Sequence, residues 1–220
     1  MVPNWAKNIL FLLIYMISGL ILVIIIEGLI SGSDLTPLNT VIEQGVVHVR
    51  GPFLTSLLVL VTQVGNPFVL ASAALLIAVL LVLRRNPYDA ALFLTALIVA
   101  IISLTVLKNV FQITRPVSDI YSADGWSFPS GHATVATTFF FLLAHTFLSH
   151  MQTPAKKVLL VTGSILGAFL VCFSRLYLGA HWALDILAGI ALGFLSVSFV
   201  ILLFNVFLAQ RRSWRKMINL

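Results

Sequence analysis

Residues 9–30 read ILFLLIYMISGLILVIIIEGLI, a run of 22 residues in which Glu27 is the single charged residue. An α-helix rises about 1.5 Å per residue, so this run is long enough to cross the hydrocarbon core of a bilayer, which is about 30 Å thick. The run is longer than the apolar region of a secretory signal peptide, and no A-x-A-like cleavage site follows it. We therefore expect a retained transmembrane helix near the start of the chain.

The composition of the whole chain is that of a membrane protein. Its 220 residues are 60% hydrophobic and 9% charged, whereas a soluble domain has about 25% charged residues. Apolar runs recur along the sequence, and the six predicted spans are residues 9–30, 68–83, 90–107, 130–148, 158–173 and 182–208. The sequence thus predicts an all-α fold, a bundle of six transmembrane helices that forms one domain over residues 1–220.

The stretch between the first two spans has a different character. Thr36-Pro37 is typical of a helix start, and apolar residues then recur at helical spacing as far as Val49. A second short apolar helix is expected from about Pro52 to Val64, because Gly65-Asn66-Pro67 would end it. We expect these short amphipathic helices to lie at the membrane surface or to pack over the bundle.

The distribution of Lys and Arg predicts how the bundle is oriented. One side of a six-span arrangement carries nine of the 13 basic residues: Lys7, Arg84, Arg85, Lys156, Lys157, Arg211, Arg212, Arg215 and Lys216. The other side carries Arg50, Lys108, Arg115 and Arg175. Because basic residues concentrate on the cytoplasmic side, both termini of this multi-pass protein are expected in the cytoplasm. We hypothesise that the membrane is a bacterial inner membrane. The net charge of +6 does not indicate nucleic-acid binding, since the basic residues do not line one exposed face.

Three polar clusters fall on the outer side of this arrangement. They are Lys108 with Arg115-Pro116, then Pro129-Ser130-Gly131-His132, then Ser174-Arg175 with His181 and Asp185. Ionisable residues beside apolar segments are costly in a membrane and mark functional sites. Arg offers a planar fork of donors and Lys a mobile charge, while glycine at a helix start lets an anion approach the backbone N–H groups. The clusters therefore predict a phosphate site on the outer face, to which the Ser130 hydroxyl adds a donor.

His181 and Asp185 are four residues apart, which places them on one face of a helix. A carboxylate bonded to one imidazole nitrogen fixes the tautomer and makes the other nitrogen a better nucleophile or base. His132 is then the candidate general acid, although spacing alone does not decide which histidine attacks. No group of His, Cys or carboxylate residues has the spacing of metal ligands, so we expect neither a metal nor another cofactor.

Together the three clusters resemble the signature motifs of the type-2 phosphatidic acid phosphatase superfamily, Lys-x6-Arg-Pro, Pro-Ser-Gly-His and Ser-Arg-x5-His-x3-Asp. The chain matches every motif position, over residues 108–185. The resemblance implies an outward-facing site at the membrane boundary and a metal-independent reaction through a phosphohistidine. It makes His181 the nucleophile, Asp185 its partner and His132 the general acid. By the same resemblance, phosphate is bound by Lys108, Arg115, Ser130, Gly131 and Arg175.

We therefore expect an integral membrane phosphatase that acts on lipid phosphates or lipid pyrophosphates, with a substrate that presents its headgroup from the bilayer. Candidate substrates are undecaprenyl pyrophosphate, phosphatidylglycerophosphate and phosphatidic acid. One alternative is a lipid-to-lipid phosphotransferase with the same intermediate. Another is an anion transporter, which would explain the cations but not the pairing of His181 with Asp185. A soluble vanadate-dependent peroxidase has a related anion pocket but not the long apolar spans.

Two further patterns carry structural expectations. The aromatic residues Tyr121, Trp126 and Phe128 are typical of an interfacial aromatic belt. Small residues four apart, Gly163 with Gly167 and Gly189 with Gly193, allow close helix contact in the fifth and sixth spans. This spacing leaves open whether these two spans touch each other.

Overall fold

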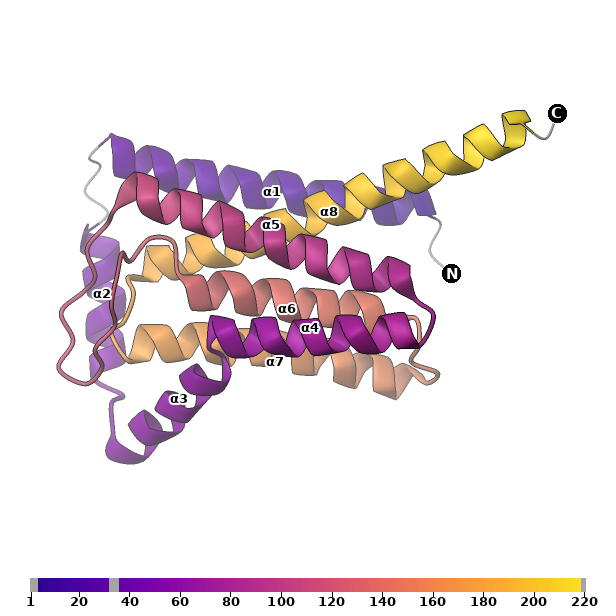
Figure 1. The fold of residues 1–220 in the computed structure, drawn as a ribbon. Helices are drawn as coiled ribbons and strands as arrows, with labels where there is room; N and C mark the ends of the chain where they lie inside the picture. The colour runs from indigo at the N-terminus through magenta and orange to yellow at the C-terminus, as the bar shows by residue number, and fades with distance from the viewer. Residues whose placement is uncertain (1–3, 32–35, 219–220) are drawn as a thin grey trace.

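Eight helices, and no strand, make up the regular structure of residues 4–31 and 36–218, the part of the chain that the computed structural model describes (Figure 1). They are α1 (Asn4–Ile30), α2 (Thr36–Val47), α3 (Pro52–Val64), α4 (Pro67–Leu83), α5 (Pro87–Phe111), α6 (Gly131–Leu148), α7 (Pro154–Tyr177) and α8 (Ala183–Ile218). The all-α prediction is confirmed, and the two short helices lie where the sequence predicts them.

Proline and short polar residues determine where the helices begin. A proline occupies the first turn of α3, α4, α5 and α7, where its missing N–H costs nothing because no carbonyl precedes it in the helix. Asn66 accepts a hydrogen bond from the Phe68 N–H, and Thr153 accepts one from the Lys156 N–H. The short polar stretches between the apolar runs thus end one helix and start the next.

Five helices are each long and apolar enough to cross a membrane: α1, α5, α6, α7, and α8 as far as Val206. The predicted second span, residues 68–83, corresponds to α4, which has 17 residues. Together, α3 and α4 qualify as a sixth span that is bent by 46° at the break between them. The outer faces of the spans are apolar, as Leu13 (53% exposed) and Leu20 (60%) illustrate on α1. The chain is therefore a multi-pass membrane protein.

Helix α6 is the centre of the bundle. It contacts α4, α5, α7 and α8, while α1 covers α8. The main core forms where α4, α5, α6 and α8 meet, and its fully buried side chains include Leu92, Phe93, Val135, Leu142 and Val197. This central position matters for function because α6 begins with the second polar cluster.

Glycines allow α7 and α8 to approach α6 closely. A Cβ atom at Gly189 would lie 2.7 Å from the Ser130 carbonyl oxygen, and one at Gly167 would lie 2.5 Å from the Phe140 ring. The small residues at these positions therefore face α6, and α7 and α8 make only minor contact with each other. The close approach at Gly189 holds the start of α8 beside the start of α6.

The helix ends that carry the three polar clusters gather at one end of the bundle, on the left in Figure 1. Helix α2 crosses this end and contacts α7 and α8, and Asn39 on α2 accepts a hydrogen bond from the Leu184 N–H at 3.4 Å. Of the two placements expected for the short helices, α2 thus packs over the bundle. The start of α1 and the end of α8 lie at the opposite end.

Candidate active site

Six segments bring the predicted site residues together. Lys108 lies in the last turn of α5, and Arg115 follows in the loop of residues 112–130. Ser130, Gly131 and His132 start α6, Arg175 is in the last turn of α7, His181 lies in the α7–α8 connection, and Asp185 is in the first turn of α8. Residues separated by up to 77 positions in the chain therefore meet at one end of the bundle.

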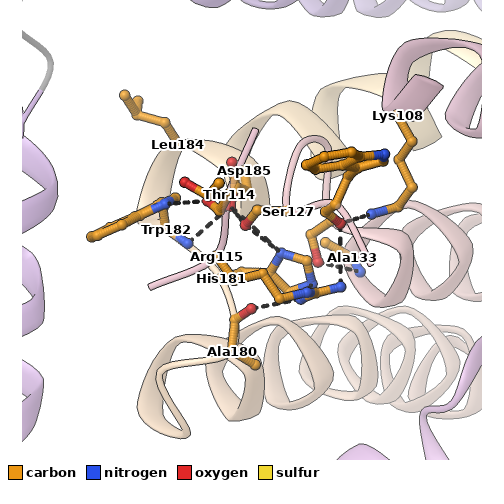
Figure 2. A network of polar contacts seen from close by, with 12 residues as sticks. Lys108, Thr114, Arg115, Ser127, Ala133, Ala180, His181, Trp182, Leu184 and Asp185 are labelled. Atoms are coloured by element: carbon orange, nitrogen blue, oxygen red, sulfur yellow. Dashed lines mark hydrogen bonds and ion pairs between the residues drawn. The ribbon is translucent and has the colours of Figure 1, made fainter. Parts of the chain in front are cut away.

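Arg115 connects the loop to His181. Its guanidinium donates hydrogen bonds to the carbonyl oxygens of Gly125 (2.9 Å), Asp124 (3.0 Å) and Trp126 (3.2 Å). Its Nη1 atom also lies 3.0 Å from His181 Nε2 (Figure 2). Because guanidinium nitrogens only donate, Nε2 must accept this bond, and the ring proton therefore resides on Nδ1.

Both cations of the first cluster donate to backbone carbonyls, and they share the carbonyl of Trp126. Arg115 Nη1 donates to the Ala180 carbonyl at 2.7 Å, and Lys108 Nζ donates to the Trp126 carbonyl at 2.5 Å. The loop of residues 112–130 therefore wraps its carbonyl oxygens around both cations. These carbonyl oxygens accept hydrogen bonds from N–H groups that could instead donate to phosphate oxygens.

A buried carboxylate and a serine hold the other side of the His181 ring. Asp185 Oδ2 lies 3.5 Å from His181 Nδ1, and Ser127 Oγ lies 3.3 Å from the same nitrogen. Ser127 Oγ donates a hydrogen bond to Asp185 Oδ2, which also accepts the Trp182 N–H at 2.9 Å. His181 and Asp185 are each 3% exposed, so water does not compete for these bonds. The network holds the ring so that Nε2 faces Arg115.

The surroundings of His181 keep its imidazole neutral. Burial, together with the nearby positive charges of Arg115, Arg175 and Lys108, lowers the pKa of His181 well below its ordinary value. A neutral ring with its proton on Nδ1 has a lone pair on Nε2 at neutral pH. Such a nitrogen can act as a nucleophile or as a base.

Arg175 is a buried cation without an acidic partner among the described residues. It is 2% exposed, its Nη1 donates to Thr62 Oγ1 at 2.9 Å, and its guanidinium carbon lies 4.9 Å from the centre of the Tyr121 ring. Its Nε atom has no hydrogen-bond partner in this part of the chain. A buried charge is costly unless it is paired, so the arrangement favours an anion beside Arg175.

The start of α6 contributes backbone donors and a second histidine. Ser130 caps the helix by accepting the Ala133 N–H at 3.4 Å, and its own N–H donates to the Asp185 carbonyl at 3.0 Å. The Ser130 hydroxyl proton is not used by this cap, so it can still donate. His132 lies in the first turn of α6, directly after Ser130 and Gly131.

The predicted residues therefore meet as one site, but the free volume beside His181 is small. The cavity lined by His181, Trp182, Pro116 and Gly179 measures about 10 Å³. This volume is about large enough for one water molecule. A phosphate group at His181 Nε2 requires Arg115 to exchange some of its present acceptors for phosphate oxygens.

Sequence reasoning missed Ser127 and Thr62, which both contact predicted site residues. Neither lies in a motif position, and a threonine in an apolar helix ordinarily bonds a carbonyl of its own helix. The aromatic-belt prediction is wrong for Phe128, which is 1% exposed and packs edge-on against Phe111. The Tyr121 ring covers the Arg175 guanidinium. Among the described residues, no group of three or more His, Cys, Asp or Glu side chains is arranged so that it could hold a metal ion.

Comparison with known proteins identifies relatives of the whole bundle. A family model described as the PAP2 superfamily matches residues 89–208, which include all three clusters. Phosphatidylglycerophosphatase B of Bacillus subtilis is 26% identical over 182 residues, which cover 81% of this chain and 89% of that protein. An undecaprenyl-diphosphatase of Sulfolobus acidocaldarius is 32% identical over 155 residues, 66% of this chain and 69% of that protein.

A solved structure shows the same arrangement of helices. The crystal structure of a transmembrane PAP2-type phosphatidylglycerolphosphate phosphatase from Bacillus subtilis superposes with a TM-score of 0.73 at 25% sequence identity. The superposition covers 93% of this chain and 96% of that one. The likeness therefore extends beyond the motifs to α1–α4, which lie before them in the sequence.

Proposed function

Because this chain belongs to the PAP2 superfamily, we propose that it is a membrane phosphatase that removes phosphate from lipid phosphate monoesters or lipid pyrophosphates through a phosphohistidine. The observation that carries this proposal is the state of His181. Its ring is buried, neutral and held by Asp185, and Nε2 faces the cation Arg115. An anion transporter has no use for such an oriented nucleophile.

The first chemical step forms a phosphorus–nitrogen bond. The lone pair of His181 Nε2 attacks the phosphorus atom while the bond from phosphorus to the lipid oxygen breaks. Protonated His132 gives its proton to that oxygen, so the lipid leaves as a neutral alcohol or, from a pyrophosphate, as a lipid monophosphate. Arg115, Arg175 and Lys108 stabilise the charge that spreads over the equatorial phosphate oxygens.

The second step hydrolyses the intermediate. His132, now neutral, accepts a proton from a water molecule whose oxygen attacks phosphorus. The phosphorus–nitrogen bond breaks, inorganic phosphate leaves, and His181 regains its lone pair on Nε2. His132 is protonated again and ready for the next substrate, so protons and charges balance over the cycle.

The substrate class follows from the relatives and from the position of the site. Two relatives are named for a phosphatidylglycerophosphate and an undecaprenyl diphosphate activity, and here the site lies at the end of membrane-spanning helices. A lipid can reach such a site with its headgroup while its chains stay in the bilayer. We propose undecaprenyl pyrophosphate, phosphatidylglycerophosphate and phosphatidic acid as candidate substrates.

Positive residues support a site on the outer face of a bacterial inner membrane. Lys7, Arg84, Arg85, Lys156 and Lys157 lie at the helix ends opposite the site. The side chains of the other four basic residues assigned to that side, Arg211, Arg212, Arg215 and Lys216, lie outside the described residues. Because basic residues favour the cytoplasm, the proposal places both termini there and the site on the periplasmic or extracellular side.

Purified protein assayed against these three lipids tests the function. We expect inorganic phosphate to be released from at least one of them at a rate well above that of the His181→Ala protein. The soluble monophosphate glycerol 3-phosphate serves as a control and should be a poor substrate. Anion flux across proteoliposomes without release of phosphate would contradict the proposal, as would transfer of the labelled phosphate to another lipid.

Removal of divalent metals is expected to leave the activity intact, because the proposal assigns charge stabilisation to Lys108, Arg115 and Arg175. The measurement compares the initial rate of phosphate release with and without excess EDTA. A rate within about twofold of the untreated enzyme is expected. Strong inhibition by EDTA that added Mg²⁺, Mn²⁺ or Zn²⁺ reverses would assign part of this role to a metal.

A further inference from the structure

We propose that Ser127 is a positioning residue that couples Asp185 to His181. In this arrangement the carboxylate acts on the imidazole through the serine hydroxyl, which lies between the two groups (Figure 2). The inference rests on the proposed function, since it concerns how the nucleophile of that reaction is held. It adds a residue that lies outside all three sequence clusters.

The distances favour a bridged contact over a direct one. A hydrogen bond between nitrogen and oxygen has a usual length of about 2.7–3.2 Å, and of the two contacts made by His181 Nδ1 the one to Ser127 is closer to this range. The separation of His181 Nδ1 from Asp185 Oδ2 is 3.5 Å, whereas Ser127 Oγ donates directly to that same oxygen and lies 3.3 Å from Nδ1. Ser127 is therefore the nearer side-chain partner of the ring nitrogen.

The bonding capacity of a hydroxyl suits this bridge. It has one proton to donate and two lone pairs with which to accept. An ionised carboxylate can only accept, so the Ser127 proton points to Asp185 and a lone pair is left for the Nδ1–H of His181. The chain of bonds thus places the ring proton on Nδ1. In this tautomer Nε2 carries no proton, and its lone pair can attack phosphorus once Arg115 turns to the phosphate.

The local fold holds Ser127 in place. Its side chain is fully buried, and its backbone N–H donates to the Ile113 carbonyl at 2.7 Å. The Trp182 N–H binds the same carboxylate oxygen that Ser127 binds, which fixes Asp185 from the other side. Two loops and the start of α8 therefore converge on the bridge, and its geometry does not depend on any exposed side chain.

The hydrogen bond from the Ser127 N–H to the Ile113 carbonyl does not involve the side chain. This contact survives replacement of the side chain, so the Ser127→Ala protein should retain a correctly folded site with a less well-held ring. Loss of a hydrogen bond to a charged group typically changes a rate or an equilibrium constant by a factor of roughly 10 to 100. We expect the loss of kcat to fall in this range and KM to change by less than about threefold, because the phosphate-binding cations are untouched.

The experiment measures kcat and KM of Ser127→Ala beside two matched serine controls from the same loop. Ser122 is exposed. Ser118 Oγ donates a structural hydrogen bond to the Leu178 carbonyl at 2.7 Å. The Ser122→Ala and Ser118→Ala proteins should keep near-normal kcat. A kcat of Ser127→Ala within twofold of wild type, or a fall equal to that of Ser118→Ala, would overturn the proposal.

A double-mutant cycle separates positioning from a merely structural role. If Asp185 acts through Ser127, adding Ser127→Ala to Asp185→Asn should lower kcat by less than about threefold. An equal effect of Ser127→Ala in both backgrounds would show that the two residues act independently and would contradict the bridge. Failure of the wild-type protein to release phosphate from any of the lipids would instead count against the proposed function itself.

Discussion

Replacement of His181 by alanine is expected to lower the rate of phosphate release by roughly 10⁴-fold or more, because the reaction loses its nucleophile. The other parts of the site remain, since Arg115 keeps its four carbonyl acceptors and Arg175 keeps Thr62. Substrate should therefore still bind, and the loss should appear in kcat. The measurement is single-turnover release of phosphate from the best substrate of the lipid panel.

His48 provides a matched control for this change. It is exposed and follows α2 at the same end of the bundle, outside all three clusters. The His48→Ala protein should release phosphate at the wild-type rate. If the His181→Ala protein keeps more than about one hundredth of the wild-type kcat, another group attacks phosphorus and the assignment of the nucleophile is wrong.

Replacement of Arg175 by alanine is expected to lower kcat/KM by roughly 100- to 1,000-fold, as loss of one preorganised donor to a developing charge commonly does. Arg175 is the most deeply buried of the site cations, and its Nε atom has no partner in the described part of the chain. Both features favour the phosphate-binding role that the proposed function assigns to it. Arg175→Lys should also be impaired, because an ammonium group cannot reproduce the planar fork.

Arg50 is the control for Arg175, because it is an arginine at the same end of the bundle and outside the clusters. Its Nε donates to the Tyr177 carbonyl at 3.1 Å, so it has a structural role at the end of α7. The Arg50→Ala protein should keep kcat/KM within about threefold of wild type. Equal losses of kcat/KM in the Arg50→Ala and Arg175→Ala proteins would mean that both changes act by disturbing the structure at the end of α7. The effect of Arg175→Ala would then not come from a lost phosphate contact.

Some parts of this site could be predicted from the sequence because they depend on short separations along the chain or on length alone. The separation of four residues brings His181 close to Asp185, and the spans follow from the length of apolar runs. The prediction that His181 and Asp185 lie on one helix face is wrong, because α8 begins at Ala183 and His181 lies in the α7–α8 connection before it. The concentration of basic residues at one set of helix ends placed all three clusters on a common face. These inferences needed no knowledge of how the helices are arranged.

Other parts depend on contacts between distant segments, and the sequence does not show them. Ser127 lies in a loop without periodicity, and its role arises because that loop passes beside the start of α8. Thr62 meets Arg175 only because α3 lies against α7. A glycine in a membrane helix allows close approach of any neighbouring helix. Here Gly167, Gly189 and Gly193 lie against α6, which occupies the centre of the bundle, whereas Gly163 has no neighbour within 4 Å.

The most direct test of the central proposal is to trap the covalent intermediate on His181. Wild-type protein would be mixed with phosphatidic acid carrying ³²P in its headgroup, quenched in alkali within one turnover, and digested for mass spectrometry. The account predicts an acid-labile, alkali-stable phosphate on His181 that is absent from the His181→Ala protein. Label on a different residue, or complete turnover with no labelled protein at any quench time, would contradict it.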